Sequence, residues 1–71
     1  MGMAVKVRML LAAREMTQQD LAKKMGKLPQ NLSQKLKRDN LSERDLIAIA
    51  EACDATFEGG FILNDTGKEI R

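Results

Sequence analysis

The chain contains no histidine, tryptophan or tyrosine, and Cys53 is its only cysteine. A single cysteine cannot form an intramolecular disulfide, and without histidine the scattered carboxylates do not make up a set of zinc ligands. The sequence also lacks a nucleophile–base pair and a glycine-rich loop of the kind that binds phosphate groups. We therefore expect a protein that is not an enzyme and uses no metal or cofactor, with Cys53 as a small buried thiol.

Long apolar runs are absent as well, since no stretch approaches the length of a membrane span. Lys6 and Arg8 interrupt the apolar residues near the N-terminus, which therefore does not resemble a signal peptide. The 71 residues suffice for one small domain, and a hydrophobic content of 44% favours folding over disorder. The expectation is a cytoplasmic protein with no membrane partner.

The formal net charge of +2 is too small to indicate a polyanionic partner by itself. Its distribution is more informative, because basic residues gather in the centre of the chain and acidic residues follow them. This pattern is typical of a protein that faces nucleic acid on one side. The residues concerned are Lys23, Lys24, Lys27, Lys35, Lys37 and Arg38, then Glu43, Asp45, Glu51, Asp54 and Glu58.

Residues 17–38 have the pattern of two helices joined by a tight turn. The Thr17 hydroxyl can accept a hydrogen bond from the first turn of the first helix, and Asp20 lies at the capping-box position. Gly26 suits a left-handed residue at the end of that helix, and Pro29 suits the first position of the second. The apolar residues at helical spacing are Leu21, Ala22, Met25, Leu32 and Leu36.

The second helix of this pair carries mainly amide and cationic side chains, with no acid before Asp39. Asn and Gln can pair with adenine edges, and Lys or Arg with guanine or phosphate. On composition alone, a solvated polar face of a small helical domain accounts for the same residues. The spacing favours a helix-turn-helix, in which the first helix packs at Ala22 and the second is presented to the major groove.

The run TQxDLAxxMG followed by PQNLS resembles the lambda-repressor-like helix-turn-helix family of the Cro/C1 or Xre type. The resemblance covers roughly residues 5–53. It implies a bundle of four or five helices that binds operator DNA as a dimer, in a protein encoded by a bacterium or a phage. The residues that carry the family signature are Gln18, Leu21, Ala22, Gly26 and Leu32.

The amides near the start of the second helix are the candidates for contacts with base edges, namely Gln30, Asn31 and Gln34. The resemblance implies a phosphate contact for the residue that opens the first motif helix, and neighbouring cations can add to it. The candidate phosphate contacts are Gln18, Lys27, Lys35, Lys37 and Arg38.

One pair of positions departs from the family. Many relatives join an Arg of the first helix to a Glu near the end of the recognition helix in a buried ion pair. The corresponding residues here are Leu11 and Leu36. Replacing both charged partners can be neutral for stability, whereas losing one leaves a buried charge. We therefore expect Leu11 to pack on Leu36, with a register shift of one residue as the alternative.

The chain is expected to divide into a disordered start (residues 1–4), a helix-turn-helix domain (residues 5–54) and a C-terminal strand or hairpin (residues 55–71). The first helix is expected over Val5–Glu15. The fourth should start after a Ser42 cap and end near Cys53 or Asp54, which takes the left-handed conformation. The predicted fold class is mainly α: a small four-helix lambda-repressor-like bundle with a C-terminal β-strand or hairpin.

Residues 56–63 predict one strand with a bulge at Gly59-Gly60, followed by a turn at 64–67 and a return strand at 68–70. An edge strand can pair with its copy across a two-fold axis. Two alternatives stay open: a lid on the helix of Leu46 and Ile49 within one subunit, or a flexible tail. The expected dimer interface consists of Phe57, Phe61, Ile62 and Leu63.

These features predict a sequence-specific transcriptional regulator, a repressor, that occupies double-stranded DNA as a homodimer. The alternative is a protein-interaction module, such as an antitoxin-like partner or an adaptor with the same fold. RNA binding is less favoured, because sequence-specific RNA modules commonly stack bases on aromatic side chains, and the central motif has none. No site for a small-molecule effector is evident.

Overall fold

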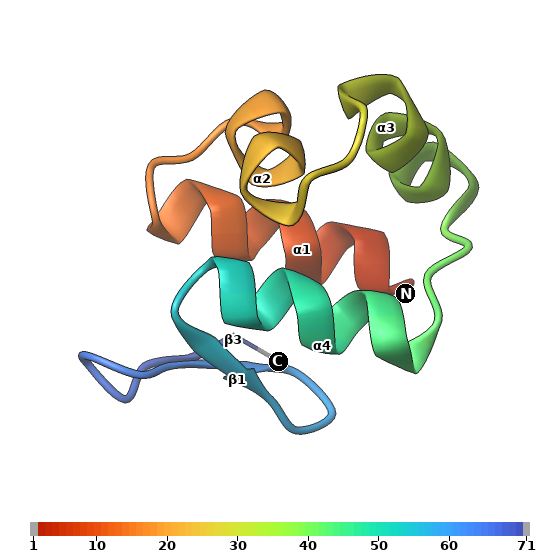
Figure 1. Cartoon of the computed structure of the whole chain (residues 1–71). Helices are drawn as coiled ribbons and strands as arrows, with labels where there is room; N and C mark the ends of the chain where they lie inside the picture. The colour runs from red at the N-terminus through yellow and green to blue at the C-terminus, as the bar shows by residue number, and fades with distance from the viewer. Residues whose placement is uncertain (1, 71) are drawn as a thin grey trace.

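The computed structural model describes residues 2–70, which form four helices and a small antiparallel sheet in a mainly α fold (Figure 1). Helix α4 lies between the α2–α3 pair on one side and the sheet on the other. The elements are α1 (Met3–Ala13), α2 (Gln18–Met25), α3 (Pro29–Arg38), α4 (Glu43–Ala52), β1 (Ala55–Phe57), β2 (Phe61–Leu63) and β3 (Glu69–Ile70).

Two capping boxes fix the starts of α2 and α4, as the sequence predicted. In the first, the Asp20 N–H donates to Thr17 Oγ1 at 3.1 Å and the Thr17 N–H donates to Asp20 Oδ2 at 3.0 Å. Ser42 and Asp45 form the second in the same way, at 3.2 and 3.0 Å. Each box satisfies two backbone N–H groups that a helix start leaves without partners.

Helix α1 begins at Met3, so the expected start at Val5 and the expected disorder of Met3 and Ala4 are wrong. The Ala4 side chain is buried, and its N–H donates to Asp39 Oδ1 at 3.0 Å. This carboxylate caps a helix that has no capping side chain of its own. The cap comes from 35 positions away, where local patterns give no signal. Met1, which belongs to the same prediction, lies outside the described residues.

Left-handed residues other than glycine follow the ends of α1 and α4. Glu15 has φ 54°, so α1 ends at Ala13 rather than at Glu15 as expected. Asp54 has φ 52°, which confirms the conformation predicted for it just after α4. In both places the chain turns sharply away from the helix axis, toward α2 and toward the sheet respectively.

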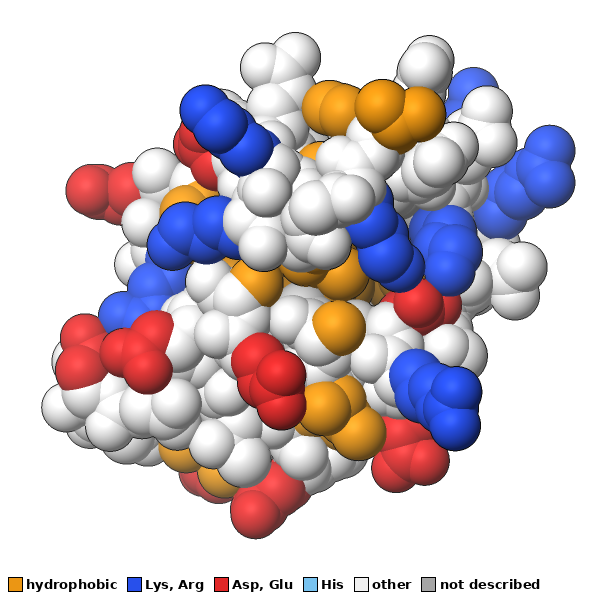
Figure 2. Space-filling model, viewed as in Figure 1, with side chains coloured by type: hydrophobic (Ala, Val, Ile, Leu, Met, Phe, Trp, Pro, Cys, Tyr) orange, Lys and Arg blue, Asp and Glu red, His pale blue; other side chains and the backbone are white. Residues whose placement is uncertain are grey.

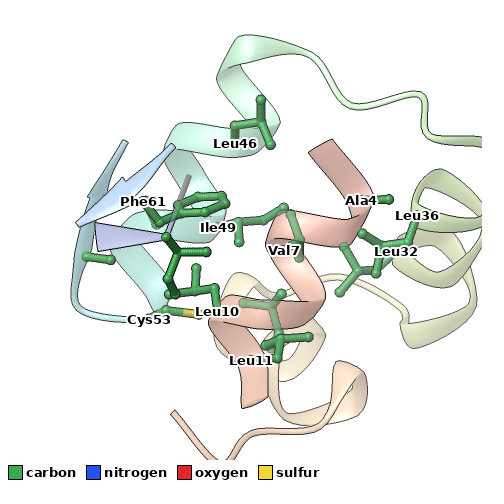
Figure 3. Packing of buried hydrophobic residues seen from close by; sticks show 14 of the residues in the cluster. Ala4, Val7, Leu10, Leu11, Leu32, Leu36, Leu46, Ile49, Cys53 and Phe61 are labelled. Carbon is green, nitrogen blue, oxygen red and sulfur yellow. The ribbon is translucent and has the colours of Figure 1, made fainter. Parts of the chain in front are cut away.

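The hydrophobic core takes one face of each helix together with side chains of all three strands (Figure 3). No polar or charged side chain among residues 2–70 is buried. The buried residues are Ala4, Val7, Leu10, Leu11, Leu21, Ala22, Leu32, Leu36, Leu46, Ile49, Ala50, Cys53, Ala55, Phe61, Leu63 and Ile70.

Leu11 and Leu36 are both buried, but the expected contact between them is wrong. Figure 3 shows Leu36 beside Ala4, near the start of α1, and Leu11 at the other end of that helix. The hydrogen bond from Ala4 to Asp39, three residues after Leu36, fixes the same arrangement. Leu11 is seven positions after Ala4 on α1, which corresponds to about 10 Å along the axis.

The expected single strand over residues 56–63 is wrong, because the chain reverses in its middle. Gly59 takes φ 69°, and the Glu58 N–H donates to the Gly60 carbonyl at 2.9 Å. The result is a hairpin in which Phe57 is opposite Phe61. A glycine at this position accepts the left-handed conformation without steric cost, which is what a tight hairpin requires.

The turn predicted at residues 64–67 and the return strand after it are confirmed. Gly67 has φ 75°, its N–H donates to the Leu63 carbonyl at 2.7 Å, and β3 pairs with β2. Phe61 and Leu63 are buried in the core of their own subunit, at 0% and 4% exposure. Their side chains are not accessible to a second subunit, so their expected role in a dimer interface is wrong. The alternative of an intramolecular lid agrees with their burial.

We predict that Phe61→Ala unfolds much of the helical structure. Removing a buried Phe costs about 3–5 kcal/mol, and a domain of 71 residues has only about 4–10 kcal/mol of stability in total. Urea unfolding followed by far-ultraviolet circular dichroism measures the loss. Ile62→Ala, half-buried on the other face of the same strand, is the control and should cost about 1 kcal/mol. Equal losses in the two variants would contradict the lid.

Candidate functional site

The turn between α2 and α3 has the geometry that the sequence predicted. Gly26 is left-handed at φ 69° and ψ 30°, and α3 starts at Pro29. The Lys27 N–H donates to the Ala22 carbonyl at 2.9 Å, which closes the end of α2. Leu21 and Ala22 are fully buried, so the two helices meet through small and apolar side chains and the turn fixes their relative direction.

The amides of α3 lie on its solvent-facing side. Gln30, Asn31 and Gln34 are all exposed, whereas Leu32 and Leu36 attach the helix to the core. Within residues 2–70, none of the three amide side chains makes a hydrogen bond to another residue. Their donors and acceptors are therefore free to contact a ligand. Gln30 and Gln34 are one turn apart, and Asn31 is turned about 100° from Gln30 around the axis.

The cationic candidates fall into two groups. Lys37 and Arg38, in the last turn of α3, are exposed and make no ion pair with any residue in the described range. Their charges also suit the negative end of the helix dipole. Lys35, in contrast, is hydrogen-bonded to both oxygens of Asp45 at 3.0 Å, and the Lys27 ammonium lies 3.9 Å from the same carboxylate.

A groove of about 590 Å³ runs along this side of the molecule, between the α2–α3 turn, α3 and the start of α4. Figure 2 shows apolar side chains at the centre of this face and basic side chains beside them. The apolar lining residues are Met25, Leu28, Leu32, Leu41 and Ile49. The polar and charged lining residues are Lys27, Asn31, Gln34, Lys35, Arg38, Asn40 and Asp45.

Gln18, the remaining candidate for a phosphate contact, is the first residue of α2 and is half-buried. It lies directly after the Thr17 cap, at a helix N-terminus where backbone N–H groups favour an anion. Its side chain makes no hydrogen bond within residues 2–70. Geometry therefore leaves Gln18 available for an anionic ligand.

Arg14 joins three parts of the molecule, a role that no local sequence pattern indicates. Its Nε donates to the Cys53 carbonyl and its Nη2 to the Asp54 carbonyl, both at 2.8 Å. Its Nη1 donates to Asp65 Oδ2 at 3.0 Å, and Asp65 Oδ1 lies 2.9 Å from Nη2. The end of α1 is thereby tied to the end of α4 and to the turn between β2 and β3.

The same contact changes the ionisation of both partners. The hydrogen bond from Arg14 lowers the pKa of Asp65, and the hydrogen bond to Asp65 raises the pKa of Arg14. For Asp45, burial alone would raise the pKa, but the Ser42 N–H and the Lys35 ammonium outweigh it, so the pKa is lowered. Burial raises the pKa of the Cys53 thiol, which therefore stays protonated at neutral pH.

We predict that the protein loses stability as the pH falls below 3.8, the pKa of an aspartate in the unfolded chain. The pKa of Asp65 is lower in the folded protein than its unfolded value of 3.8. The ionised Asp65 therefore stabilises the fold fully above pH 3.8, and this stabilisation is lost as the pH falls through the folded pKa. Asp65→Asn removes one such group, so its unfolding midpoint in urea should change less with pH than that of the wild type. Glu58→Gln, an exposed carboxylate on the β1–β2 turn, is the matched control. A parallel pH profile in Asp65→Asn would contradict the contribution of this pair.

We also predict that Asp39→Ala destabilises the protein by about 1 kcal/mol, because it removes the cap of α1. Ala is in addition a poor residue at φ 53°. Asp39→Asn keeps an acceptor oxygen and tolerates the left-handed conformation, so it should unfold close to the wild type in urea. A loss of similar size in both variants would show that the cap is not the cause.

Among the expected interface residues, Phe57 and Ile62 are the two that stay partly exposed. The ring of Phe57 packs on that of Phe61, with centroids 5.6 Å apart and planes inclined by 55°. β1 and β3 are the edges of the sheet. A homodimer through this region stays a prediction, and it would now rest on these edges rather than on Phe61 and Leu63.

In the described part of the chain, no cluster of three or more His, Cys, Asp or Glu side chains is arranged to hold a metal ion. No helix there has the length and apolar character needed to cross a membrane. Comparisons of the chain with protein-family models, with curated proteins and with solved structures found no match.

Proposed function

We propose that this protein is a sequence-specific regulator of transcription that binds double-stranded DNA through α2 and α3 as a lambda-repressor-like helix-turn-helix domain. The observation that carries the proposal is the outer side of α3. Among residues 2–70, three of its amides and two of its cations have no partner, and α3 contains no acid. Amides that are exposed and free of internal hydrogen bonds can read base edges, and cations can hold phosphates.

In the proposed complex, α3 enters the major groove with its N-terminal half toward the bases. Gln30 and Gln34 face the base edges, and Asn31 contacts the flank of the same site. Gln18 at the start of α2 and the pair Lys37 and Arg38 at the end of α3 contact phosphates. A single domain touches little DNA, so two subunits bind adjacent half-sites in the cytoplasm of a bacterium, each acting by occupancy.

The groove favours a second candidate function, a module that binds another protein. Leu28 is 59% exposed at its rim, although it is a large apolar residue. Exposed apolar residues in a groove are common where a partner helix or peptide binds. Binding to duplex DNA that weakens steeply with salt would separate the two functions, because a neutral apolar partner would not show it.

We predict that Gln34→Ala weakens discrimination at one base pair of a site selected from random duplexes. The loss should be about 1–3 kcal/mol at that position, with little change in affinity for random DNA. Fluorescence anisotropy on the selected site and on single-base variants measures it. Gln19→Ala, which removes an exposed amide of α2 rather than of α3, is the control. An equal loss of affinity for selected and random DNA would show that Gln34 does not contact a base edge.

We further predict that Lys37→Gln lowers the salt dependence of binding to random duplex DNA. The slope of log affinity against log salt should become shallower by about 0.9, the value of one lost phosphate contact. Lys68→Gln changes an exposed lysine between β2 and β3, outside α2 and α3. The control should leave the slope as it is, and an unchanged slope in Lys37→Gln would argue against a phosphate contact there.

A further inference from the structure

Asp45 collects contacts from three elements around the groove beside α3. Its Oδ2 accepts from the Ser42 N–H at 3.0 Å, which caps α4. Both of its oxygens accept from Lys35 Nζ at 3.0 Å, and Oδ1 lies 3.9 Å from Lys27 Nζ. The Asp45 side chain is 14% exposed, whereas the two lysine side chains are more than 40% exposed.

The cap of α4 does not require the two lysines. The box formed by Thr17 and Asp20 on α2 has the same two hydrogen bonds at nearly the same lengths. Asp20 makes no ion pair with any residue in the described range. Within residues 2–70 the two caps have the same hydrogen bonds, and only the cap beside α3 has ammonium groups within 3.9 Å of its carboxylate.

We propose that Asp45 is a specificity-determining residue that holds Lys35 and Lys27 away from DNA phosphates and so limits binding to random sequences. The proposal rests on the proposed DNA-binding function. Lys35 follows Gln34 and is turned about 100° from it around the axis of α3. Its ammonium is bound to Asp45, in the groove that Gln34 and Arg38 also line.

The physical reason is competition for the ammonium groups. Phosphate contacts strengthen binding to every sequence alike, because the backbone carries no sequence information. A lysine already paired with a carboxylate must give up that partner before it can neutralise a phosphate. Asp45 thus removes two charges from the part of binding that ignores sequence, while Gln30 and Gln34 stay free to read bases.

The test is Asp45→Asn, which keeps an oxygen that can accept from the Ser42 N–H but removes the charge. Affinity for a random duplex is measured by fluorescence anisotropy over a series of salt concentrations. We expect a slope of log affinity against log salt that is steeper than that of the wild type by about 0.9 for each lysine released, up to about 1.8. The ratio of affinities for selected and random DNA should fall.

Asp20→Asn is the matched control, because it makes the same change in the other capping box, where no ammonium group among residues 2–70 is within ion-pair distance. It should leave the slope unchanged. The single variant Lys35→Gln should also leave the slope unchanged, because Asp45 is still present. In the double variant Asp45→Asn/Lys35→Gln, the slope should be shallower by about 0.9 than in Asp45→Asn alone. A merely structural role of Asp45 would not produce this dependence of one substitution on the other.

Each outcome decides between the alternatives. If the wild type binds duplex DNA but Asp45→Asn and the wild type have equal slopes, the inference is overturned and the proposed function stands. If Lys35→Gln alone lowers the slope, Lys35 already contacts phosphate and the inference is also overturned. If no variant binds duplex DNA in a salt-dependent way, the proposed function fails, and the inference fails with it. Should Asp45→Asn not fold by circular dichroism, Lys35→Gln decides alone: an unchanged slope supports the inference and a shallower slope overturns it.

Discussion

The direction of α3 depends mainly on contacts near its two ends, because the helix itself buries just Leu32 and Leu36. At its start, Gly26 lets the chain turn sharply from α2. At its end, the Asp39 carboxylate caps α1 and so joins the last turn of α3 to the first turn of another helix. The amides on the outer side keep a fixed position only while these contacts hold.

The sheet completes the core on the far side of α4 from α3. Phe61 has no exposed surface, so the sheet acts as a cover over the helices. Arg14 links this cover to the helical part through two carbonyl oxygens and Asp65. A small domain gains much from such a cover, because 71 residues bury a limited apolar area without one. The sheet and the outer side of α3 are therefore separate surfaces.

Features that depend on residues within about four positions of one another could be predicted from the amino-acid order. These include both capping boxes, the left-handed Gly26, the start of α3 at Pro29 and the turn that ends at Gly67. Hydrogen bonds of this kind form within one turn of chain, so residue type and spacing suffice to predict them. The exposed amides of α3 followed from the same helical periodicity.

Contacts between distant segments, in contrast, became known from the folded chain. The cap of Ala4 by Asp39 spans 35 positions and the bond from Lys35 to Asp45 spans 10, so neither follows from a local pattern. The burial of Phe61 depends on a chain reversal at Gly59. The alternation of apolar and polar residues over 56–63 predicted a continuous strand there instead. Such contacts are set by how helices and strands dock, which depends on the shape of the whole core rather than on the spacing of neighbouring residues.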